Sequence, residues 1–439
     1  MNDIYAAKLA AMIRQETVSE NGQSDLSKFY AFHDLLRELF PSLFAVCEFR
    51  EFQGSILMRW PGRERPEPAR QGLFLMNHND VVQAAGSWIH PPFSGEIADG
   101  KLWGRGALDD KGPLFGMLQA AEELVSEGFV PARDVWFESA CTEEIMGEGA
   151  DTISQWLREQ GYRFEMVLDE GGMILTEPIG GAKGDFAMIG VGEKGCADVR
   201  FVAKSLGGHA SAPPKNTPMV RLGKFMSYVD RSEIFDVQLS PVLCEMLRRL
   251  APHMEGVSAK AMTRPEKYAP LIKRIMAKSS PTAAALLKTT IAFTRASGSG
   301  GNNVIPDEAW VIGNMRYSHH QGKEKSLAAI TKAAKRYGIE PEVLDPGFES
   351  PVSDWNGSAF RLVEDAVGKV FPGTACSPYI MTGASDSRFM SRISDQCIRF
   401  APFHITDEQM ASIHGANENV DVRSLLPAVQ FYKIIIRSF

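Results

Sequence analysis

The chain has 439 residues, of which 44% are hydrophobic and 23% charged, and this composition is typical of a globular protein with a large core. A net charge of −7 without a basic stripe argues against nucleic acid as a partner, and no apolar run approaches the ~20 residues of a membrane helix, so we expect no membrane span. The N-terminal segment MNDIYAAKLAAMIRQE mixes charge into an apolar periodicity. It predicts an amphipathic helix rather than a signal peptide, and the cytoplasm is therefore the expected location.

Three apolar stretches in the N-terminal part of the chain predict strands. They are GLFLM (72–76), DVWFESA (134–140) and EMVLD (165–169), and they alternate with helical periodicity. Between the first two, apolar residues recur from position 114 to 124 at the spacing of one buried helix face, and Gly128 follows where a left-handed cap is expected. This alternation predicts an α/β domain whose central sheet is mostly parallel and is flanked by helices.

A different pattern begins near residue 190, where strands and helices alternate as in a small ferredoxin-like unit. The expected elements are strands at 190–204, 308–317 and 341–344, helices around 219–230 and within 322–337, and a helix-rich insertion over roughly 235–295. The chain then returns to α/β character, with helices around 357–370 and near 425–437. We therefore expect a first catalytic part at 1–191, an inserted α+β domain at 192–348 and a second catalytic part at 349–439.

Histidines and carboxylates stand at five places where predicted strands end or helices begin. These are His78 and Asp80, Asp109, Glu143 and Glu144, Asp169 and Glu170, and His414. The carboxyl ends of strands converge on the ligand crevice of open α/β sheets, so residues far apart in sequence can meet there. Taken singly, each place has an ordinary structural explanation; Asp109 and Asp110, for example, could cap the helix that follows. Together they offer the ligands that divalent ions prefer, and the six cysteines form no close pair that would compete.

The motifs HND, GRGALDDKG, TEE, LDEGG and IHGANE occur in this order and resemble those of the dinuclear zinc exopeptidase and amidohydrolase family. This family includes aminoacylase, glutamate carboxypeptidase, carnosinase-type dipeptidases and acetylornithine deacetylase. The resemblance covers nearly the whole chain and is strongest toward the branch of carboxypeptidase S and the N-fatty-acyl-amino-acid hydrolases. It implies an enzyme that hydrolyses an amide bond adjacent to a free carboxylate with two divalent ions, zinc in the first place and cobalt or manganese as alternatives.

The resemblance also implies how the site residues divide the work. The implied ligands are Asp109 between the two ions, His78 and Glu170 on one ion, and Glu144 and His414 on the other. Glu170 is preferred at its position, but Asp169 stays open as the alternative because related enzymes use either residue type at that strand end. A cis peptide bond is expected between Asp109 and Asp110.

Two further carboxylates are expected to support the chemistry. Glu143 would be the general base, because a metal-bound water has its pKa brought from ~15.7 toward ~7 and a neighbouring carboxylate can then take its proton. Asp80 would orient His78, because a metal-ligating imidazole usually donates its other nitrogen to a carboxylate and the residue two along a strand points to the same face. The hydroxide shared by the two ions would then attack the amide carbon.

His209, Asn303 and Arg388 are candidates for contacts with the substrate, and His209 also for a contact between subunits. His209 in SLGGHASAP resembles the family histidine that reaches across from a partner subunit to stabilise the oxyanion, which implies a homodimer and a lid and dimerisation role for the inserted domain; a plain glycine-rich turn is the alternative. Asn303 in GGNNVIP and Arg388 in TGASDSRF resemble positions that grip the substrate carboxylate. Arg388 could instead form a structural ion pair with Asp386.

The leading hypothesis is therefore a carboxypeptidase, a dipeptidase or a hydrolase of N-acyl amino acids. A deacylase of acetylated or succinylated biosynthetic intermediates is the alternative among enzymes. A non-catalytic binding homologue is the remote alternative, because such a chain would usually have lost a ligand or the base, and every position is present here.

Overall fold

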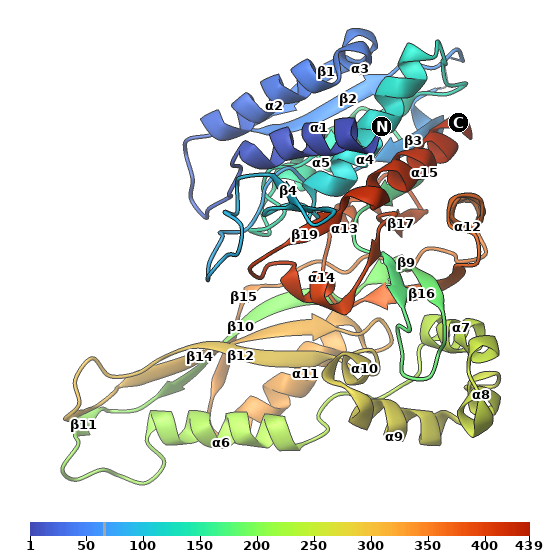
Figure 1. The fold of residues 1–439 in the computed structure, drawn as a ribbon. Helices are drawn as coiled ribbons and strands as arrows, with labels where there is room; N and C mark the ends of the chain where they lie inside the picture. Colours follow the sequence, from blue (N-terminus) through green and yellow to red (C-terminus); the bar gives the residue numbers. More distant parts are fainter. Residues whose placement is uncertain (65–66) are drawn as a thin grey trace.

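The computed structural model describes residues 1–64 and 67–439, and within them the strands form a ten-stranded sheet and a separate four-stranded sheet, besides two small ones (Figure 1). The large sheet has the order β1-β2-β6-β3-β7-β17-β9-β8-β18, with β16 paired to β9. Its centre consists of β6 (Val135–Ser139), β3 (Gln71–Leu75) and β7 (Phe164–Asp169), which pair in parallel. These are the three strands that the apolar stretches predict, so this part of the fold is confirmed.

The large sheet is mixed, because it contains antiparallel pairs in addition to its parallel ones. At one edge, β1 (Glu48–Phe52) and β2 (Ser55–Trp60) form an antiparallel hairpin. Its two-residue turn, Gln53 and Gly54, has positive φ at both positions, which is the turn geometry that antiparallel hairpins prefer. Toward the other edge, β9 (Asp185–Glu193) runs antiparallel to β17 and β8. The parallel centre was predicted, and the antiparallel pairs of β1, β2 and β9 were not.

Side chains of the parallel strands alternate between two hydrophobic cores, as the period of two in a strand requires. Leu73 of β3 lies in one core together with residues of the helices α4 (Lys111–Ser126) and α15 (Leu425–Arg437). Phe74 lies in the other core, with residues of α5 (Gly149–Glu159). Helices therefore cover both faces of the sheet, and the strand ends are left to carry the polar residues.

The helix α4 confirms the predicted buried face and cap. Its apolar positions between 114 and 124 are buried. Gly128 has a φ of 76°, and its N–H donates to the carbonyl oxygen of Val125 at 2.9 Å, as in a left-handed C-terminal cap. The predicted helices nearer the chain ends are also present, as α1 (Asn2–Arg14) and α12 (Ser358–Val370). No helix in the described ranges is both long and apolar enough to span a bilayer.

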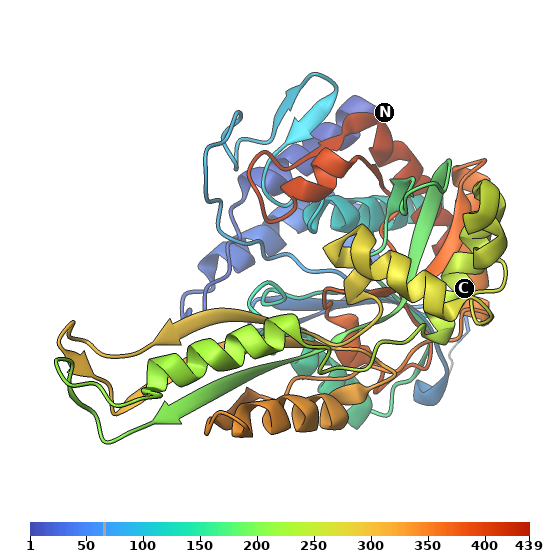
Figure 2. The ribbon, with the colours of Figure 1, turned by 90° about the horizontal axis from the view of Figure 1, so that it is seen from below.

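The four-stranded sheet has the order β12-β14-β10-β15, and all its pairs are antiparallel. Its elements, in chain order, are β10 (Gly195–Lys204), α6 (Pro218–Arg231), β12 (Thr290–Ser297), β14 (Glu308–Tyr317), α11 (Gly322–Lys335) and β15 (Glu340–Asp345). The strand β12 was not predicted, because it lies at an edge with most of its side chains exposed and so lacks a clear alternation. Figure 2 shows this sheet and α6 extending away from the large sheet as an arm.

The helix-rich segment between α6 and β12 contacts the large sheet. Its helices are α7 (Pro241–Leu250), α8 (Gly256–Met262), α9 (Ala269–Ser279) and α10 (Pro281–Ala285). Leu247 of α7 and Met276 of α9 belong to one hydrophobic cluster with Phe186 of β9. The helix-rich segment therefore packs against the large sheet, whereas the arm has a hydrophobic cluster of its own.

A single residue connects a strand of the large sheet to a strand of the arm. The strand β9 of the large sheet ends at Glu193 and β10 of the arm begins at Gly195, so only Lys194 separates them. Glu193 accepts a hydrogen bond from Arg399 Nε at 3.1 Å within the large sheet. The Lys194 ammonium donates to the carbonyl oxygen of Lys288 at 2.8 Å, just before β12. The junction is thus tied to both parts.

Candidate metal and active site

Residues that follow the parallel strands come together at the carboxyl edge of the large sheet. His78 lies just beyond β3, Glu144 just beyond β6, and Asp109 precedes α4. One side-chain ligand atom from each of these residues lies within 4.8 Å of the others, in a geometry that could hold a metal ion. The predicted convergence of His78, Asp109 and Glu144 is therefore present.

Asp109 lies between two histidines. Its Oδ1 is 3.0 Å from His78 Nε2, and its Oδ2 is 3.0 Å from His414 Nε2. The same His414 nitrogen is 2.9 Å from Glu144 Oε2. Each oxygen of Asp109 thus faces a different histidine, which is the arrangement that a bridging carboxylate requires. The peptide bond between Asp109 and Asp110 is cis, as predicted.

The backbone and charge of His414 reflect this environment. Its φ of 58° lies in the left-handed region, which a residue with a side chain adopts mainly where the surroundings impose it. Hydrogen bonds that the carboxylates of Asp109 and Glu144 accept from its imidazole raise the pKa of His414 to about 10. These carboxylates therefore stabilise positive charge at the position where a cation would be held.

Asp80 connects three of the predicted site residues. Its Oδ1 is 3.4 Å from His78 Nδ1, and its two oxygens accept hydrogen bonds from the backbone N–H groups of Glu143 at 3.2 Å and Glu144 at 3.1 Å. The Nδ1–H of His78 also faces the carbonyl oxygen of Asp80 at 3.0 Å, which leaves Nε2 as the nitrogen turned toward Asp109. Asp80 therefore fixes the Glu143–Glu144 turn as well as the imidazole.

Glu143 lies beside a buried arginine. Its Oε1 is 3.8 Å from Arg388 Nη1, and Arg388 Nη2 is 3.3 Å from Asp386 Oδ1. Burial raises the pKa of Glu143 well above its usual range, although the positive charges of His78 and Arg388 act in the opposite direction. The structural ion pair of Arg388 with Asp386 is thus present, and the same guanidinium faces the candidate base.

Two carboxylates end β7, and their environments differ. Asp169 Oδ2 accepts a hydrogen bond from the backbone N–H of Ser387 at 2.9 Å. Burial raises the pKa of Glu170 well above its usual range, and the nearby charges of Asp169, Asp110 and Asp109 raise it further. Asp169 is therefore held by the protein backbone, whereas the charges that act on Glu170 are those of neighbouring carboxylates.

The site contains more carboxylates than its histidines can neutralise. One carboxylate oxygen of Glu144 also has no hydrogen-bond partner within the described ranges. Glu144 Oε1 is buried, and among the residues that the structure describes no hydrogen-bond partner reaches it. Buried carboxylates without partners are costly, and they are the oxygen ligands that divalent ions accept alongside imidazole nitrogen. The donor set therefore fits divalent metal ions.

His209 and Asn303 do not join this cluster within one chain. His209 belongs to β11 (Gly208–His209), which pairs with β13 (Val304–Ile305) at the tip of the arm, and its side chain is exposed (Figure 1). Asn303 lies beside it, since its carbonyl oxygen accepts from the N–H of Ala210 at 2.9 Å. The two predicted residues are thus neighbours, remote from the carboxyl edge of their own large sheet.

The sequence analysis missed Glu418, which lies in the same motif as His414. Glu418 is fully buried, and its carboxylate accepts hydrogen bonds from the backbone N–H groups of Leu108 at 2.8 Å and Asp109 at 3.1 Å. A second acidic residue four positions after a candidate ligand was the available signal. It was overlooked because a role in holding backbone has no spacing pattern of its own.

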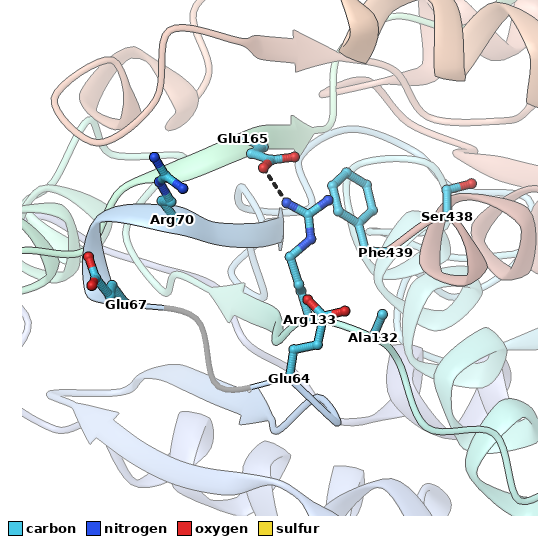
Figure 3. A pocket seen from close by; sticks show the side chains of 8 residues that line it. All are labelled: Glu64, Glu67, Arg70, Ala132, Arg133, Glu165, Ser438 and Phe439. Atoms are coloured by element: carbon cyan, nitrogen blue, oxygen red, sulfur yellow. Dashed lines mark hydrogen bonds and ion pairs between the residues drawn. The ribbon is translucent and has the colours of Figure 1, made fainter.

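A cavity of about 810 Å³ lies at the opposite edge of the large sheet (Figure 3). Its lining includes Arg70, just before β3, Arg133, just before β6, and Glu165, near the start of β7, and Arg133 pairs with Glu165. These are the amino ends of the parallel strands. Ligands of open α/β sheets bind at the carboxyl ends, so this cavity is separate from the candidate site.

The chain is similar to several known proteins in sequence and in fold. The sequence model of the peptidase family M20/M25/M40 matches residues 74–438. A human N-fatty-acyl-amino acid synthase/hydrolase is 32% identical over 376 residues, covering 85% of this chain and 75% of the relative. A probable carboxypeptidase S-like protein of Dictyostelium discoideum is 28% identical, covering 100% of this chain and 86% of the relative. The crystal structure of an M20 family metallo-carboxypeptidase from Sulfolobus solfataricus has the same fold, with a TM-score of 0.72 at 18% identity and coverage of 99% and 98% of the two chains.

Proposed function

This chain belongs to the peptidase family M20/M25/M40, as its motifs indicate, and we propose that it cleaves an amide bond adjacent to a free carboxylate, in a small peptide or an N-acyl amino acid. It is an enzyme of the metallopeptidase and amidohydrolase type. The observation that carries the proposal is the position of Asp109 between His78 and His414, with Glu143 in the adjoining turn.

The proposed cofactor is a pair of divalent ions, with zinc expected and cobalt or manganese as alternatives. The residues that would hold them are Asp109 between the ions, His78 and Glu170 on one, and Glu144 and His414 on the other. Support comes from the separation of the ligand atoms of His78, Asp109 and Glu144, the unpartnered Glu144 oxygen and the hydrogen bond that already engages Asp169. Such ions, when bound, supply an activated water and a Lewis acid for the scissile carbonyl.

Glu143 is the proposed general base and then the general acid. Its carboxylate would accept the proton of the attacking water and pass it to the nitrogen of the leaving amine. The raised pKa that burial gives Glu143 suits both steps, because a more basic carboxylate takes the proton more readily and holds it until the bond breaks. Asp80, through the backbone of the same turn, would keep Glu143 in position.

The arm is the proposed lid and dimerisation domain, with a ferredoxin-like fold and the bounds 192–348, between catalytic parts at 1–191 and 349–439. Its tip carries His209 and Asn303 far from the site of the same chain, so they would act in the site of a partner subunit. Asn303 and Arg388 are the proposed contacts of the substrate carboxylate. The exposed position of His209 supports this proposal, since a histidine that serves a neighbour must be free to reach it.

Mixed dimers test whether His209 acts across subunits. The variants Glu143→Gln and His209→Ala should each be nearly inactive alone. Loss of the general base costs about 10²–10⁴-fold in kcat, and loss of an oxyanion donor costs about 10²–10³-fold. Random mixing of the two in a symmetric dimer should restore about a quarter of the wild-type activity, since half of the dimers then contain one complete site. Unmixed variants are the control. Mixtures that stay inactive, although mass spectrometry shows mixed dimers, would place His209 outside the partner's site.

A substrate panel tests the proposed reaction. Purified protein with zinc is incubated with dipeptides, acetyl-amino acids, succinyl-amino acids and long-chain acyl amino acids, and free amine is measured. We expect release from the peptides or the acyl amino acids and none from the corresponding C-terminal amides, which lack the carboxylate. Preference for short acetyl or succinyl groups would instead support the deacylase alternative. No release from any compound would favour a binding role.

A further inference from the structure

We propose that Arg105 and Glu418 form a reciprocal clamp that positions Asp109 and His414 relative to each other. The inference rests on the proposed metal site, and it concerns how that site is held rather than which residues bind the ions. Each clamp residue belongs to one of the two loops that carry these ligands, and each one bonds to the backbone of the other loop. Neither is adjacent to a ligand in sequence.

The carboxylate of Glu418 organises the loop before α4. One oxygen accepts from the N–H groups of Leu108 at 2.8 Å and Asp109 at 3.1 Å. The other accepts from the N–H of Gly106 at 3.1 Å and from Arg105 Nη1 at 2.6 Å. Four donors therefore converge on one buried carboxylate, and one of them is the backbone of the bridging residue itself.

The guanidinium of Arg105 connects the loop before α4 to the loop that carries His414. It is buried, and its Nη2 donates to the carbonyl oxygen of Gly415 at 2.6 Å, directly after His414. Its carbon Cζ also lies 5.3 Å from the centre of the Trp88 ring. A planar guanidinium can hold Glu418 and the Gly415 carbonyl at the same time because its N–H groups form a rigid fork.

The clamp acts on one side of the site. His414 is the half-exposed ligand with a left-handed backbone, and its loop is linked to Asp109 through these contacts. His78 is instead held by Asp80 and by the strand end. Loosening the clamp should therefore affect the ion held by Glu144 and His414 more than the ion held by His78 and Glu170.

The variant Arg105→Lys tests the clamp while keeping a buried positive charge. An ammonium cannot reproduce the fork, so the contact with Gly415 or the contact with Glu418 is lost. Protein freed of metal is titrated with Co²⁺, whose visible absorption reports the coordination of each ion, and stoichiometry is checked by elemental mass spectrometry. We expect the ion held by Glu144 and His414 to bind about 10–100-fold more weakly than in the wild type, as for other residues that support a ligand. The other ion should be weakened less, because Asp109 is the only one of its ligands that the clamp contacts.

Glu418→Gln is the second variant, in case Arg105→Lys does not fold. An amide offers one acceptor oxygen, so its nitrogen would face two of the four donors. We expect it to weaken the same ion. Arg423→Lys and Glu408→Gln are matched controls at exposed positions in the same C-terminal part, and both should bind two ions like the wild type.

The outcomes separate this proposal from the proposed function. A wild type that binds two ions, with folded clamp variants that bind both ions at wild-type affinity, would overturn the clamp and leave the metal site standing. Equal weakening of both ions would also overturn it, because it would indicate general loosening. A wild type that binds no ions would overturn the metal site and the clamp together.

Discussion

Replacing Glu143 with glutamine should lower kcat by about 10²–10⁴-fold, the contribution of a positioned general base, while two metal ions remain bound. Glutamine has the size of glutamate but cannot accept the proton of the attacking water. The ligands lie on other side chains, so metal content should not change. Steady-state kinetics on the best substrate of the panel, together with elemental analysis of the same protein sample, measure both quantities.

The control for this variant is Glu148→Gln, five residues along the same loop. Glu148 is exposed, and its replacement by glutamine removes the same charge outside the site. It should keep wild-type kinetics. If Glu143→Gln had nearly normal kcat, Glu143 would not be the base. Loss of metal together with activity would show instead that Glu143 supports the ligands.

Removal of the metal should abolish activity, and zinc, cobalt or manganese should restore it. The reason is that the described carboxylates and histidines form a donor cluster, and none of them is placed to activate water as strongly as a bound divalent ion does. Dialysis against a strong chelator, followed by titration with each metal salt, measures the loss and the recovery. Activity that persisted in protein shown to be metal-free would contradict the proposed mechanism.

Asp109→Asn should reproduce the loss without a chelator. An asparagine keeps the shape of the side chain but removes its charge and one of its two acceptor oxygens, and the bridging position needs both. We expect the affinity for both ions to fall and added metal to restore little activity. Asp99→Asn, an exposed change in the preceding hairpin, is the control and should bind metal and turn over normally.

The parallel centre of the fold could be predicted because its strands are almost entirely buried. In β3, β6 and β7 the burial leaves continuous apolar runs, and the buried face of α4 gives a clear helical period. The hairpin of β1 and β2 was not predicted, because the exposed strand β1, EFREF, has charged residues at most of its positions. The edge strand β12 was missed for a similar reason. Edge strands are determined by strand pairing and by turns, and the pattern of apolar residues does not predict these features.

The candidate site could be predicted only as far as its motifs reach. His78, Asp109 and Glu144 stand at predicted strand or helix ends, and the structure brings them together. The contacts that hold them could not be predicted, because Glu418 acts by accepting backbone hydrogen bonds from a loop some three hundred residues earlier. The contact that holds Asp169 likewise comes from Ser387, a residue of a distant element.

The single-residue junction at Lys194 makes the arm a long lever. The ten residues of β10 extend about 33 Å at ~3.3 Å per residue, so a rotation of about 5° at the junction displaces the far end by about 3 Å. The Lys194 ammonium also bonds to the carbonyl oxygen of Lys288, just before β12, so a second strand of the arm is connected to this junction. Small changes in backbone angle there are thus magnified where His209 lies, by an amount comparable to the length of a hydrogen bond.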